Sequence, residues 1–376
     1  MRIGIWSDIL SATTGYGENS RYLLKGLKER GHDVFELALQ WQGKPLDIDG
    51  IPVYPGHPDF LGSTMRRMKK PDCIIHIRDS WLMIDRFSIG KPYHPLPVLS
   101  SLGIKFIQYF PVQSIPAPIE LANAVTSESD FAIVHANCQK KTLTDQGAPA
   151  DRIEVLHHGV DPTLFHPGEG DYTEYGVPES KKTILVVGSN TERKNLPGSF
   201  LVLRRLLDGH IDANLYLHTQ LNGYFALDEH IRALGLANSD RIYRSLTNES
   251  PNVTLWGDDE KVYANMFRCA KAYLSMSWSE GFGVPHLQAL ASGLPTIITD
   301  TPIHRELFSE FGARFIKSHQ AISTSWGYEW LADADSAAFM LRAALKEKRP
   351  SSVYIPPNFL WPNIVKKMES YLEKWI

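Results

Sequence analysis

Cysteines are scarce in this chain, and long apolar runs are missing. Three cysteines occur in 376 residues, Cys73, Cys138 and Cys269, and none has Cys-x-x-Cys spacing. A disulfide scaffold and a zinc site are therefore not expected, and each cysteine is expected to pack as a small apolar residue. No apolar stretch reaches about 18 residues, so no membrane span is predicted. Met1 leads directly into a predicted strand rather than a signal peptide, which favours a cytoplasmic protein.

Charge of one sign is not in excess either. Lys and Arg number 39 and Asp and Glu number 42, which gives a net charge of -3 and a sequence pI of about 6.5. Nucleic acid is therefore not expected to be attracted over the whole surface, although a local basic groove is compatible with this balance. The segment Met65–Lys70 is basic with apolar interruptions. It fits either a solvated helix face or a surface for peripheral membrane contact.

Length and pattern predict two α/β domains. A chain of 376 residues exceeds the size at which one core usually stops growing. Strand-like runs alternate with helix-like segments in both halves, which predicts parallel sheets. We predict domains at 1–165 and 183–358, a linker at 166–182 that is rich in Pro, Gly and charge, and a last helix at about 360–376. The strands expected after the linker are Thr183–Gly188, Ala213–His218, Val253–Trp256, Ala272–Met276, Pro295–Thr299 and Ala313–Ile316.

A carboxylate stands directly before a glycine turn in the second half. Glu280–Gln288 reads Glu-Gly-Phe-Gly-Val-Pro-His-Leu-Gln between a predicted strand and a predicted helix. The carboxylate can face a sugar hydroxyl while backbone N–H groups of the turn hold a phosphate. The same residues also fit an ordinary strand-to-helix turn, with Pro285 in the first helical turn. The helix, the following strand and Asp300 form a doubly wound α/β unit, in which ligands bind at the carboxyl ends of the strands. This context favours a nucleotide-sugar site.

Two adjacent cations lie in an earlier turn. Ser189–Asn195 is a polar turn that carries Arg193 and Lys194, between a β-branched strand and a helix predicted at Leu196–Leu207. Two cations at such a turn suit a diphosphate, because charge-assisted hydrogen bonds contribute roughly 1.5 to 3 kcal/mol each. A solvated basic turn is the alternative.

The amino terminus predicts a similar arrangement. Arg2–Trp6 is a predicted strand, Ser7–Gly17 a loop with two glycines near its end, and Glu18–Arg30 a helix closed by Gly31. The loop glycines, Gly15 and Gly17, fit contact with a phosphate, or a loop that only turns the chain.

Four segments of the chain resemble segments of one enzyme family. Trp278–Asp300 resembles the signature of the family-4 type, group 1, retaining glycosyltransferases with the GT-B fold, Glu-Gly-Phe-Gly-x-Pro-x-x-Glu-Ala, and the second Glu is replaced here by Gln288. Gly188–Leu196 resembles the phosphate-binding segment of that family, although Ser189 stands where many relatives have Arg. His157–Asp161 is similar to the family's Pro-Asn-Gly-Val-Asp segment. The end of the chain, which begins at Phe359, is similar to the family's closing Phe-x-Trp segment and the helix that follows it.

The resemblance implies a fold and a reaction. It implies two Rossmann-like, doubly wound domains with parallel sheets, a cleft between them, and a carboxyl-terminal helix that crosses back to the first domain. It further implies transfer of a sugar from a nucleoside diphosphate sugar with retention of configuration, with neither metal nor cofactor. Arg193 and Lys194 would stabilise charge on the leaving diphosphate, and Glu280 would bind hydroxyls of the sugar. The implied donor-binding residues are Gly15, Gly17, Ser189, Gly257, Asp258, Gly281, Phe282, Gly283, Val284 and Gln288.

The acceptor site is the least defined part. Many relatives place a His at the end of an amino-domain strand, but the equivalent stretch, Lys105–Gln113, has none. His76 and Asp79 are the alternatives at another predicted strand end. His76 fits a structural role as well as a catalytic one, whereas the Asp79 carboxylate beside Trp81 suits a sugar or another polyol. The acceptor itself stays open among a glycan, a lipid-linked sugar, a protein and a small molecule. The remaining candidate histidines, His157, His158, His286 and His304, are expected to be structural or to support the residues that contact the ligands.

Other functions remain open on the same residues. A sugar phosphorylase would need a pyridoxal phosphate lysine site, which the sequence does not reveal, and a GT-B nucleotide-sugar epimerase is a further alternative. A catalytically inactive sugar-binding or scaffold protein would explain Gln288 and the missing His. We take glycosyl transfer as the leading hypothesis.

Overall fold

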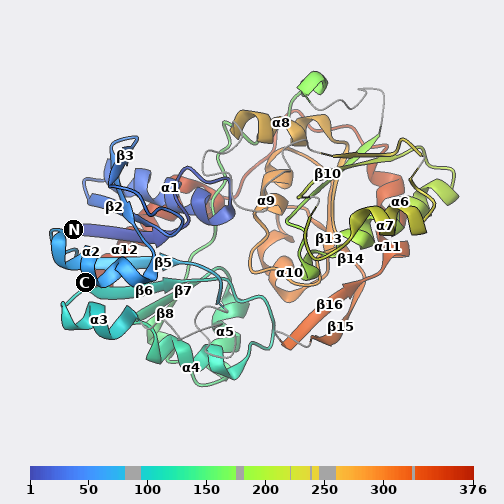
Figure 1. The fold of residues 1–376 in the computed structure, drawn as a ribbon. Coiled ribbons are helices and arrows are strands. Elements are labelled where there is room, and N and C mark those ends of the chain that lie inside the picture. Colours follow the sequence, from blue (N-terminus) through green and yellow to red (C-terminus); the bar gives the residue numbers. More distant parts are fainter. Residues whose placement is uncertain (81–94, 175–181, 221, 238, 245–259, 324–326) are drawn as a thin grey trace. The chain divides into compact units, whose positions relative to one another are not determined.

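The computed structural model describes residues 1–80, 95–174, 182–220, 222–237, 239–244, 260–323 and 327–376. These residues form two compact units (Figure 1). The first unit contains Met1–Gly159 and Pro357–Ile376, and the second is formed by the described residues between Val160 and Pro356. The domain boundaries and the linker predicted from the sequence stay predictions beside this division.

The first unit is built on an eight-stranded sheet in the order β3-β4-β2-β1-β5-β6-β7-β8. Neighbouring strands are parallel except β3 and β4. The strands are β1 Arg2–Ser7, β2 Asp33–Ala38, β3 Leu46–Ile48, β4 Ile51–Pro55, β5 Cys73–Ile77, β6 Lys105–Tyr109, β7 Phe131–Val134 and β8 Ile153–Val155. Its helices are α1 Gly15–Glu29, α2 Pro58–Arg67, α3 Pro95–Ser101, α4 Ile119–Ser127, α5 Asn137–Asp145, η3 Ala150–Arg152, η6 Pro357–Phe359 and α12 Trp361–Trp375. The strand order reverses between β1 and β5, which makes this the switch point of the sheet.

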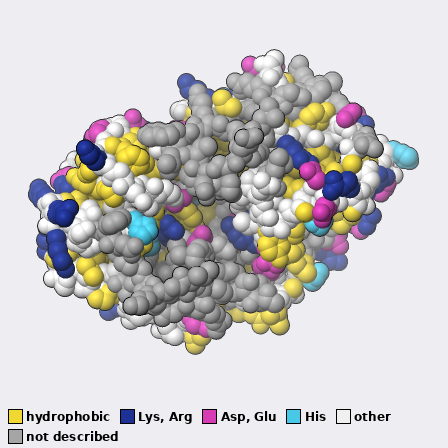
Figure 2. All heavy atoms as spheres, in the orientation of Figure 1, with side chains coloured by type: hydrophobic (Ala, Val, Ile, Leu, Met, Phe, Trp, Pro, Cys, Tyr) yellow, Lys and Arg dark blue, Asp and Glu magenta, His cyan; other side chains and the backbone are white. Residues whose placement is uncertain are grey.

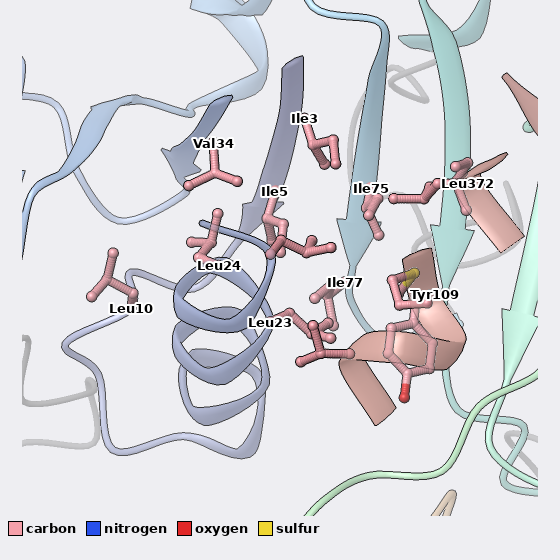
Figure 3. Close-up of a cluster of buried hydrophobic side chains, with 14 of the residues drawn as sticks. Ile3, Ile5, Leu10, Leu23, Leu24, Val34, Ile75, Ile77, Tyr109 and Leu372 are labelled. Carbon is pink, nitrogen blue, oxygen red and sulfur yellow. The ribbon is translucent and has the colours of Figure 1, made fainter. Parts of the chain in front are cut away.

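The carboxyl-terminal helix α12 belongs to the core of the first unit. Its residues Ile364, Met368 and Leu372 are buried, as helical spacing predicts. Figure 3 shows Leu372 near side chains of the central strands, among them Ile75. A Cβ on Gly26 of α1 would lie 2.5 Å from a methyl group of Val365, so the glycine lets the two helices approach closely. The expected α/β fold with a crossing last helix is thus confirmed.

Helix α1 begins earlier than the sequence predicted. The predicted loop ran to Gly17, but α1 already starts at Gly15, because the Thr14 hydroxyl accepts a hydrogen bond from Gly17 N–H at 3.0 Å and caps the helix. Gly17 is buried, and a Cβ there would lie 2.6 Å from the carbonyl oxygen of Ala12. Close packing of the helix on its own loop therefore explains this glycine. Gly31 follows the helix with φ +87°, as predicted.

The second unit is built on a six-stranded parallel sheet in the order β11-β10-β9-β12-β13-β14. Its strands are β9 Thr183–Val187, β10 Asn214–His218, β11 Ile242–Arg244, β12 Ala272–Ser275, β13 Thr296–Thr299 and β14 Arg314–Ile316. Its helices are η4 Tyr172–Glu174, η5 Glu192–Lys194, α6 Leu196–Asp208, α7 Leu227–Ala233, α8 Glu260–Cys269, α9 Val284–Ala291, α10 Pro302–Phe308 and α11 Ala334–Ala344. The predicted strands agree within about a residue, except Val253–Trp256, which lies outside the described residues. The switch point of this sheet lies between β9 and β12.

An antiparallel hairpin in the second unit was not predicted. Strands β15 Ser318–Ser323 and β16 Gly327–Ala332 pair with each other. Trp330 on β16 donates its backbone N–H to the Trp278 carbonyl at 2.8 Å. The hairpin therefore supports the backbone directly before Glu280. Polar residues dominate β15, so its pattern lacks the apolar run that revealed the buried strands.

The basic segment Met65–Lys70 spans the end of α2. Met65 is buried and Met68 packs against the same apolar cluster, whereas the four cations of the segment are exposed. Figure 2 shows Lys and Arg side chains along the edge of the first unit where α2 lies in Figure 1. This arrangement favours a solvated helix face. Among the described helices, none combines the length and apolar character that crossing a membrane requires.

Candidate active site

The turn after β9 presents two cations at the carboxyl edge of the second sheet. It contains the short helix η5 and ends at Asn195, whose backbone is left-handed with φ 44° and ψ 49°. The Asn195 side chain accepts a hydrogen bond from Gly198 N–H at 3.3 Å and donates to the Met276 carbonyl at 3.2 Å. It thereby caps α6 and ties the turn to the end of β12. Asn195 was absent from the predicted site residues, because its partner is distant in sequence.

The turn after β12 carries the carboxylate. Trp278 donates its backbone N–H to the Arg193 carbonyl at 2.7 Å, and its own carbonyl accepts a hydrogen bond from the Trp330 N–H. The turn after β9 and strand β16 therefore both hold this segment in place. Gly283 has φ +93° and precedes α9 as its N-cap residue, which explains the glycine at this position. Phe282 is buried with its ring 5.7 Å from that of Phe308, so only its backbone can face a ligand.

Three residues predicted as catalytic meet across the switch point between β9 and β12. Arg193 Nη1 donates to Glu280 Oε2 at 2.7 Å and to the Ser279 carbonyl at 3.0 Å. Lys194 Nζ forms an ion pair with the other carboxylate oxygen, Oε1. The side chains of Glu280, Lys194 and Arg193 are 5%, 11% and 30% exposed, so Arg193 is the one most open to solvent.

This ion cluster keeps its carboxylate charged. Burial alone would raise the pKa of Glu280, but Lys194 and Arg193 outweigh it and hold the pKa well below the ordinary value of 4.5. An ionised carboxylate only accepts hydrogen bonds, so Glu280 suits hydroxyl groups. The two cations suit an anion such as a phosphate, which would share them with the carboxylate. A Cβ at Gly188 would lie 3.3 Å from Lys194 Cδ, so this glycine leaves room for the lysine stem.

Gln288, the departure from the family signature, lies on α9 of the same unit. Its side chain is 1% exposed, and its Oε1 accepts a hydrogen bond from the Tyr263 hydroxyl at 3.0 Å. Tyr263 lies on α8 and was not among the predicted residues. The amide oxygen is therefore already engaged within the protein.

The other predicted donor residues are less closely gathered. Ser189 is exposed on the turn after β9, and Val284 is the partly buried first residue of α9. Gly281 is buried beside Glu280. Gly257 and Asp258 lie outside the described residues. Gly15 is exposed at the start of α1 in the first unit.

Two histidines near the carboxylate turn lie in the core of the second unit. The Tyr273 hydroxyl lies 3.0 Å from His286 Nδ1, and His304 Nδ1 donates to the Thr299 carbonyl at 2.7 Å. Burial lowers the pKa of both imidazoles, so they stay neutral. A Cβ on Gly283 would lie 2.4 Å from His286 Cδ2, so the ring packs directly beneath the turn. Both histidines take the structural place expected of them.

In the first unit, His76 is held among aromatic rings. It stacks on Trp6 with ring centroids 4.2 Å apart, and its Nδ1 lies 2.9 Å from Gln108 Oε1. Burial lowers its pKa to about 3, so the imidazole is neutral at physiological pH. This favours the structural alternative for His76 over a contact with the acceptor.

Asp79 follows β5 and remains partly exposed. Its Oδ1 accepts a hydrogen bond from the Tyr16 hydroxyl at 2.5 Å, and Gln113 Nε2 lies 3.4 Å away. Tyr16 belongs to the first turn of α1, which follows β1. A pair of residues therefore spans the switch point of the first sheet as well.

Metal ligands are not gathered in the part of the chain that the structure describes. No group of three or more His, Cys, Asp or Glu side chains there is arranged to hold a metal ion. Cys73, Cys138 and Cys269, all in the described part, form no disulfide bond.

Part of the chain is similar to a known family. Residues 171–347 match the profile of the family described as "Glycosyl transferases group 1". An uncharacterized glycosyltransferase of Methanocaldococcus jannaschii is 22% identical over 94% of this chain and 92% of its own length. The D-inositol 3-phosphate glycosyltransferase of Mycolicibacterium smegmatis is 29% identical over 58% of this chain. This chain covers about half of that relative, 48% of its length.

Solved structures share the fold. Sucrose-phosphate synthase from Thermosynechococcus elongatus superposes with a TM-score of 0.73 at 12% identity, over 100% of this chain and 98% of that one. The Anabaena protein HepE in complex with UDP-glucose gives a TM-score of 0.68 at 12% identity, over 100% of both chains. The fold is thus GT-B. The matched profile and the glycosyltransferase relatives support a glycosyltransferase.

Proposed function

We propose that the protein transfers a sugar from a nucleoside diphosphate sugar to a hydroxyl group of an acceptor, with retention of configuration and without a metal. The observation that carries this proposal is the cluster of Arg193, Lys194 and Glu280 at the switch point of the second sheet. In this proposal, the two cations bind the diphosphate and Glu280 binds hydroxyls of the sugar. The complex of HepE with UDP-glucose supports a nucleotide sugar as the donor of this fold.

The proposed step breaks one bond and forms one bond. The bond between the anomeric carbon and the diphosphate oxygen breaks, and the acceptor oxygen bonds to the same face of that carbon. The acceptor proton passes to the released diphosphate. Negative charge grows on the leaving phosphates as the bond breaks, so Lys194 and Arg193 would bind the transition state more strongly than the ground state.

Glu280 would not act as a proton donor in this scheme. Its pKa is held well below the ordinary value, so it is a carboxylate at any pH near neutrality. Its proposed task is to position the sugar through hydrogen bonds from hydroxyl groups. The hairpin contact from Trp330 to Trp278 would keep this carboxylate in place.

A donor panel tests the function. The protein would be incubated with UDP-, GDP- and ADP-sugars, with and without EDTA, and release of nucleoside diphosphate would be measured. Slow hydrolysis of at least one donor, unaffected by EDTA, is expected. The anomeric configuration of a transferred sugar, read by NMR, would match that of the donor. Absence of hydrolysis with every donor would favour an inactive protein, and loss of activity in EDTA would contradict metal independence.

We further propose a cytoplasmic location and membership of the family-4 type. Peripheral membrane contact through the end of α2 would depend on charge alone, because Met65 and Met68 pack inward. Sedimentation with vesicles of phosphatidylserine and phosphatidylcholine at low salt tests this contact. We expect weak binding that disappears at high salt, as for a solvated basic surface.

A further inference from the structure

A groove lies on the second unit beside the turn that carries Arg193 and Lys194. Helix α6 packs against both α7 and α11 (Figure 1). The start of α6, the end of α7, the end of β12 and the junction of β16 with α11 line a groove of about 380 Å³. Small-molecule sites commonly measure roughly 300 to 1,000 Å³, and an apolar cavity of about 150 Å³ already holds benzene. The groove therefore has room for a molecule of one or two rings.

The lining of the groove is mostly apolar. Leu201 of α6 and Leu234 of α7 contribute to its walls, and both are only partly buried. Met276, directly after β12, is 2% exposed and so forms the deepest part of the lining. Among the described residues that line the groove, none is Lys, Arg, Asp or Glu. An ionised ligand would lose its hydration here without gaining an ion pair, so the lining favours an uncharged molecule.

Met276 also favours an aromatic ligand over an aliphatic one. Methionine sulfur makes favourable contacts with aromatic rings, which an aliphatic molecule cannot offer. Two polar groups, the Asn195 amide and the His230 imidazole, complete the lining. His230 is exposed and lies at the rim, where its ring nitrogens can meet a hydroxyl or N–H group of a ligand. The lining thus fits an apolar ring that bears one such group.

The groove includes the hydrogen bonds that hold the end of the cation turn. Asn195 Nδ2 donates to the Met276 carbonyl at 3.2 Å, and Asn195 Oδ1 accepts from Gly198 N–H at 3.3 Å. Both distances lie at or beyond the upper end of the usual range of roughly 2.7 to 3.2 Å. All three residues line the groove. Lys194 directly precedes Asn195, so a ligand that contacts Asn195 acts on the position of this cation.

A second support of the ion cluster also reaches the groove. Ala332 and Ala334 line it where β16 ends and α11 begins. Trp330, two positions before Ala332 on the same strand, donates its backbone N–H to the Trp278 carbonyl at 2.8 Å. A ligand in the groove would therefore contact both elements that hold the cations and the carboxylate, the Asn195 cap and the hairpin.

We propose that this groove binds one small, uncharged aromatic molecule with a hydroxyl or N–H group, and that its occupation changes the affinity of the cation turn for a diphosphate. Binding of the aromatic molecule is independent of the proposed function, whereas the effect on diphosphate affinity rests on it. The coupling is reciprocal, so a bound diphosphate changes the affinity for the aromatic molecule by the same factor. The aromatic molecule takes no part in the reaction itself.

Indole and phenol are the probes for this groove, and cyclohexanol is the aliphatic comparison. Saturation-transfer NMR with the whole chain should show transfer to at least one of the two aromatic probes, and less to cyclohexanol. Ala233→Phe, at an exposed lining position on α7, fills part of the groove and should weaken binding of the better probe about 10-fold or more. Leu201→Ala removes a wall on α6 and should weaken it about 3-fold or more. Ala237→Phe, exposed and outside the lining, should bind the probe as wild type does.

Three results would overturn the binding site. They are a lack of transfer to both aromatic probes in wild type, a signal for cyclohexanol that exceeds both, and equal probe affinity in wild type and in folded Ala233→Phe and Leu201→Ala. Circular dichroism and urea unfolding establish that the variants are folded.

Calorimetry of UDP, GDP and ADP with and without saturating probe tests the coupling. In wild type, the Kd of the diphosphate that binds best should change about 5-fold or more when the probe is bound. In Ala233→Phe, addition of the probe should leave this Kd unchanged. Equal diphosphate affinity with and without bound probe in wild type would overturn the coupling. Absence of diphosphate binding in a protein that still binds the probe would overturn the proposed function, and the coupling with it, but not the binding site.

Discussion

The two sheets reverse their strand order in the same way, but different chemistry spans the two switch points. In the second unit, Lys194 after β9 forms an ion pair with Glu280 after β12. In the first unit, Tyr16 after β1 donates a hydrogen bond to Asp79 after β5. Both pairs contain a carboxylate, but only the carboxylate of the second unit, Glu280, forms ion pairs with cations.

The difference lies in the partners of each carboxylate. A site with two cations and a carboxylate can bind phosphates and hydroxyls together, which suits a nucleotide sugar. At the first switch point, the Asp79 carboxylate accepts a hydrogen bond from the Tyr16 phenol at 2.5 Å, and the Gln113 amide lies 3.4 Å away. The same topology therefore carries different side-chain chemistry at its two reversals.

Buried carboxyl groups elsewhere extend the contrast. Glu36 on β2 is 0% exposed and Glu280 is 5% exposed, so both carboxyl groups are buried. Their surroundings nevertheless shift the pKa of the two groups in opposite directions. Burial raises the pKa of Glu36 to about 8, although the Leu10 N–H bond to Oε2 lowers it in part. Glu36 therefore holds the loop before α1 as a neutral acid, whereas Glu280 is ionised.

Removal of Glu280 should have the largest effect. Glu280→Ala is expected to abolish transfer while nucleoside diphosphate binding persists, because the proposed function assigns the phosphates to Arg193 and Lys194. Transfer rates and calorimetric titration of UDP and GDP measure both. Glu192→Ala, an exposed carboxylate on the neighbouring turn, is the matched control. Full turnover in the alanine variant would contradict the assignment to the sugar.

The charge of Glu280 also predicts a pH dependence of stability. The pKa is lower in the folded protein than the ordinary value of 4.5, so the ionised group stabilises the fold above pH 4.5 and this contribution is lost as the pH falls through the folded pKa. As the pH falls below 4.5, the free energy of unfolding of wild type should therefore decrease relative to that of Glu280→Gln. Urea unfolding of the two proteins from pH 7 to pH 3 measures the difference. A constant difference across this range would contradict a depressed pKa.

Gln288→Glu should have a moderate effect on nucleotide binding. In the family that the sequence resembles, the matching Glu accepts hydrogen bonds from both ribose hydroxyls, and bonds to a charged acceptor are about twice as strong as neutral ones. The variant should bind nucleoside diphosphates a few-fold more tightly, with Tyr263 still donating to it. Tyr263→Phe serves as the companion variant, since it removes a hydrogen-bond donor to the amide oxygen. Weaker binding in a folded Gln288→Glu protein would mean that the site is built around the amide.

Glu36→Gln should have the smallest effect on activity, and its effect on stability should grow as the pH rises from 4.5 to about 8. The folded pKa of about 8 lies above the ordinary value of 4.5, so the stability contributed by protonated Glu36 is complete below pH 4.5 and is lost as the pH rises towards 8. Glutamine keeps an acceptor for Leu10 N–H and cannot ionise. The variant should therefore exceed wild type in Tm above pH 8, and the gap should close towards pH 5. Glu29→Gln, at an exposed position, is the control. A Tm difference between Glu36→Gln and wild type that does not change with pH would contradict the raised pKa of Glu36.

The sequence predicted the second switch point better than the first for a physical reason. Arg193, Lys194 and Glu280 lie in short segments where charge, glycine and strand-to-helix transitions occur together, so local pattern reveals them. Tyr16 and Tyr263 became visible only through partners 63 and 25 positions away. Long-range pairs of this kind leave no local pattern.

Backbone features followed the same rule. The positive φ of Gly31 and Gly283 was predictable because each ends or begins a helix. The start of α1 was predicted too late, since the two glycines near its start suggested a loop while the Thr14 cap decided the outcome. The hairpin β15–β16 and the Trp330 contact were missed, because polar strands lack an apolar signal.

The most direct test of the central claim compares diphosphate and nucleoside affinity in Lys194→Ala. Calorimetry would measure UDP, GDP and ADP against uridine, guanosine and adenosine in wild type, Lys194→Ala and the exposed control Lys271→Ala. The account predicts that Lys194→Ala loses about 2 to 3 kcal/mol, roughly 30- to 150-fold, of affinity for the diphosphate that binds best, and none for its nucleoside. Arg193→Ala should lose less, because its side chain is the more exposed of the two. Unchanged diphosphate affinity in Lys194→Ala would contradict the claim that this switch point binds the donor.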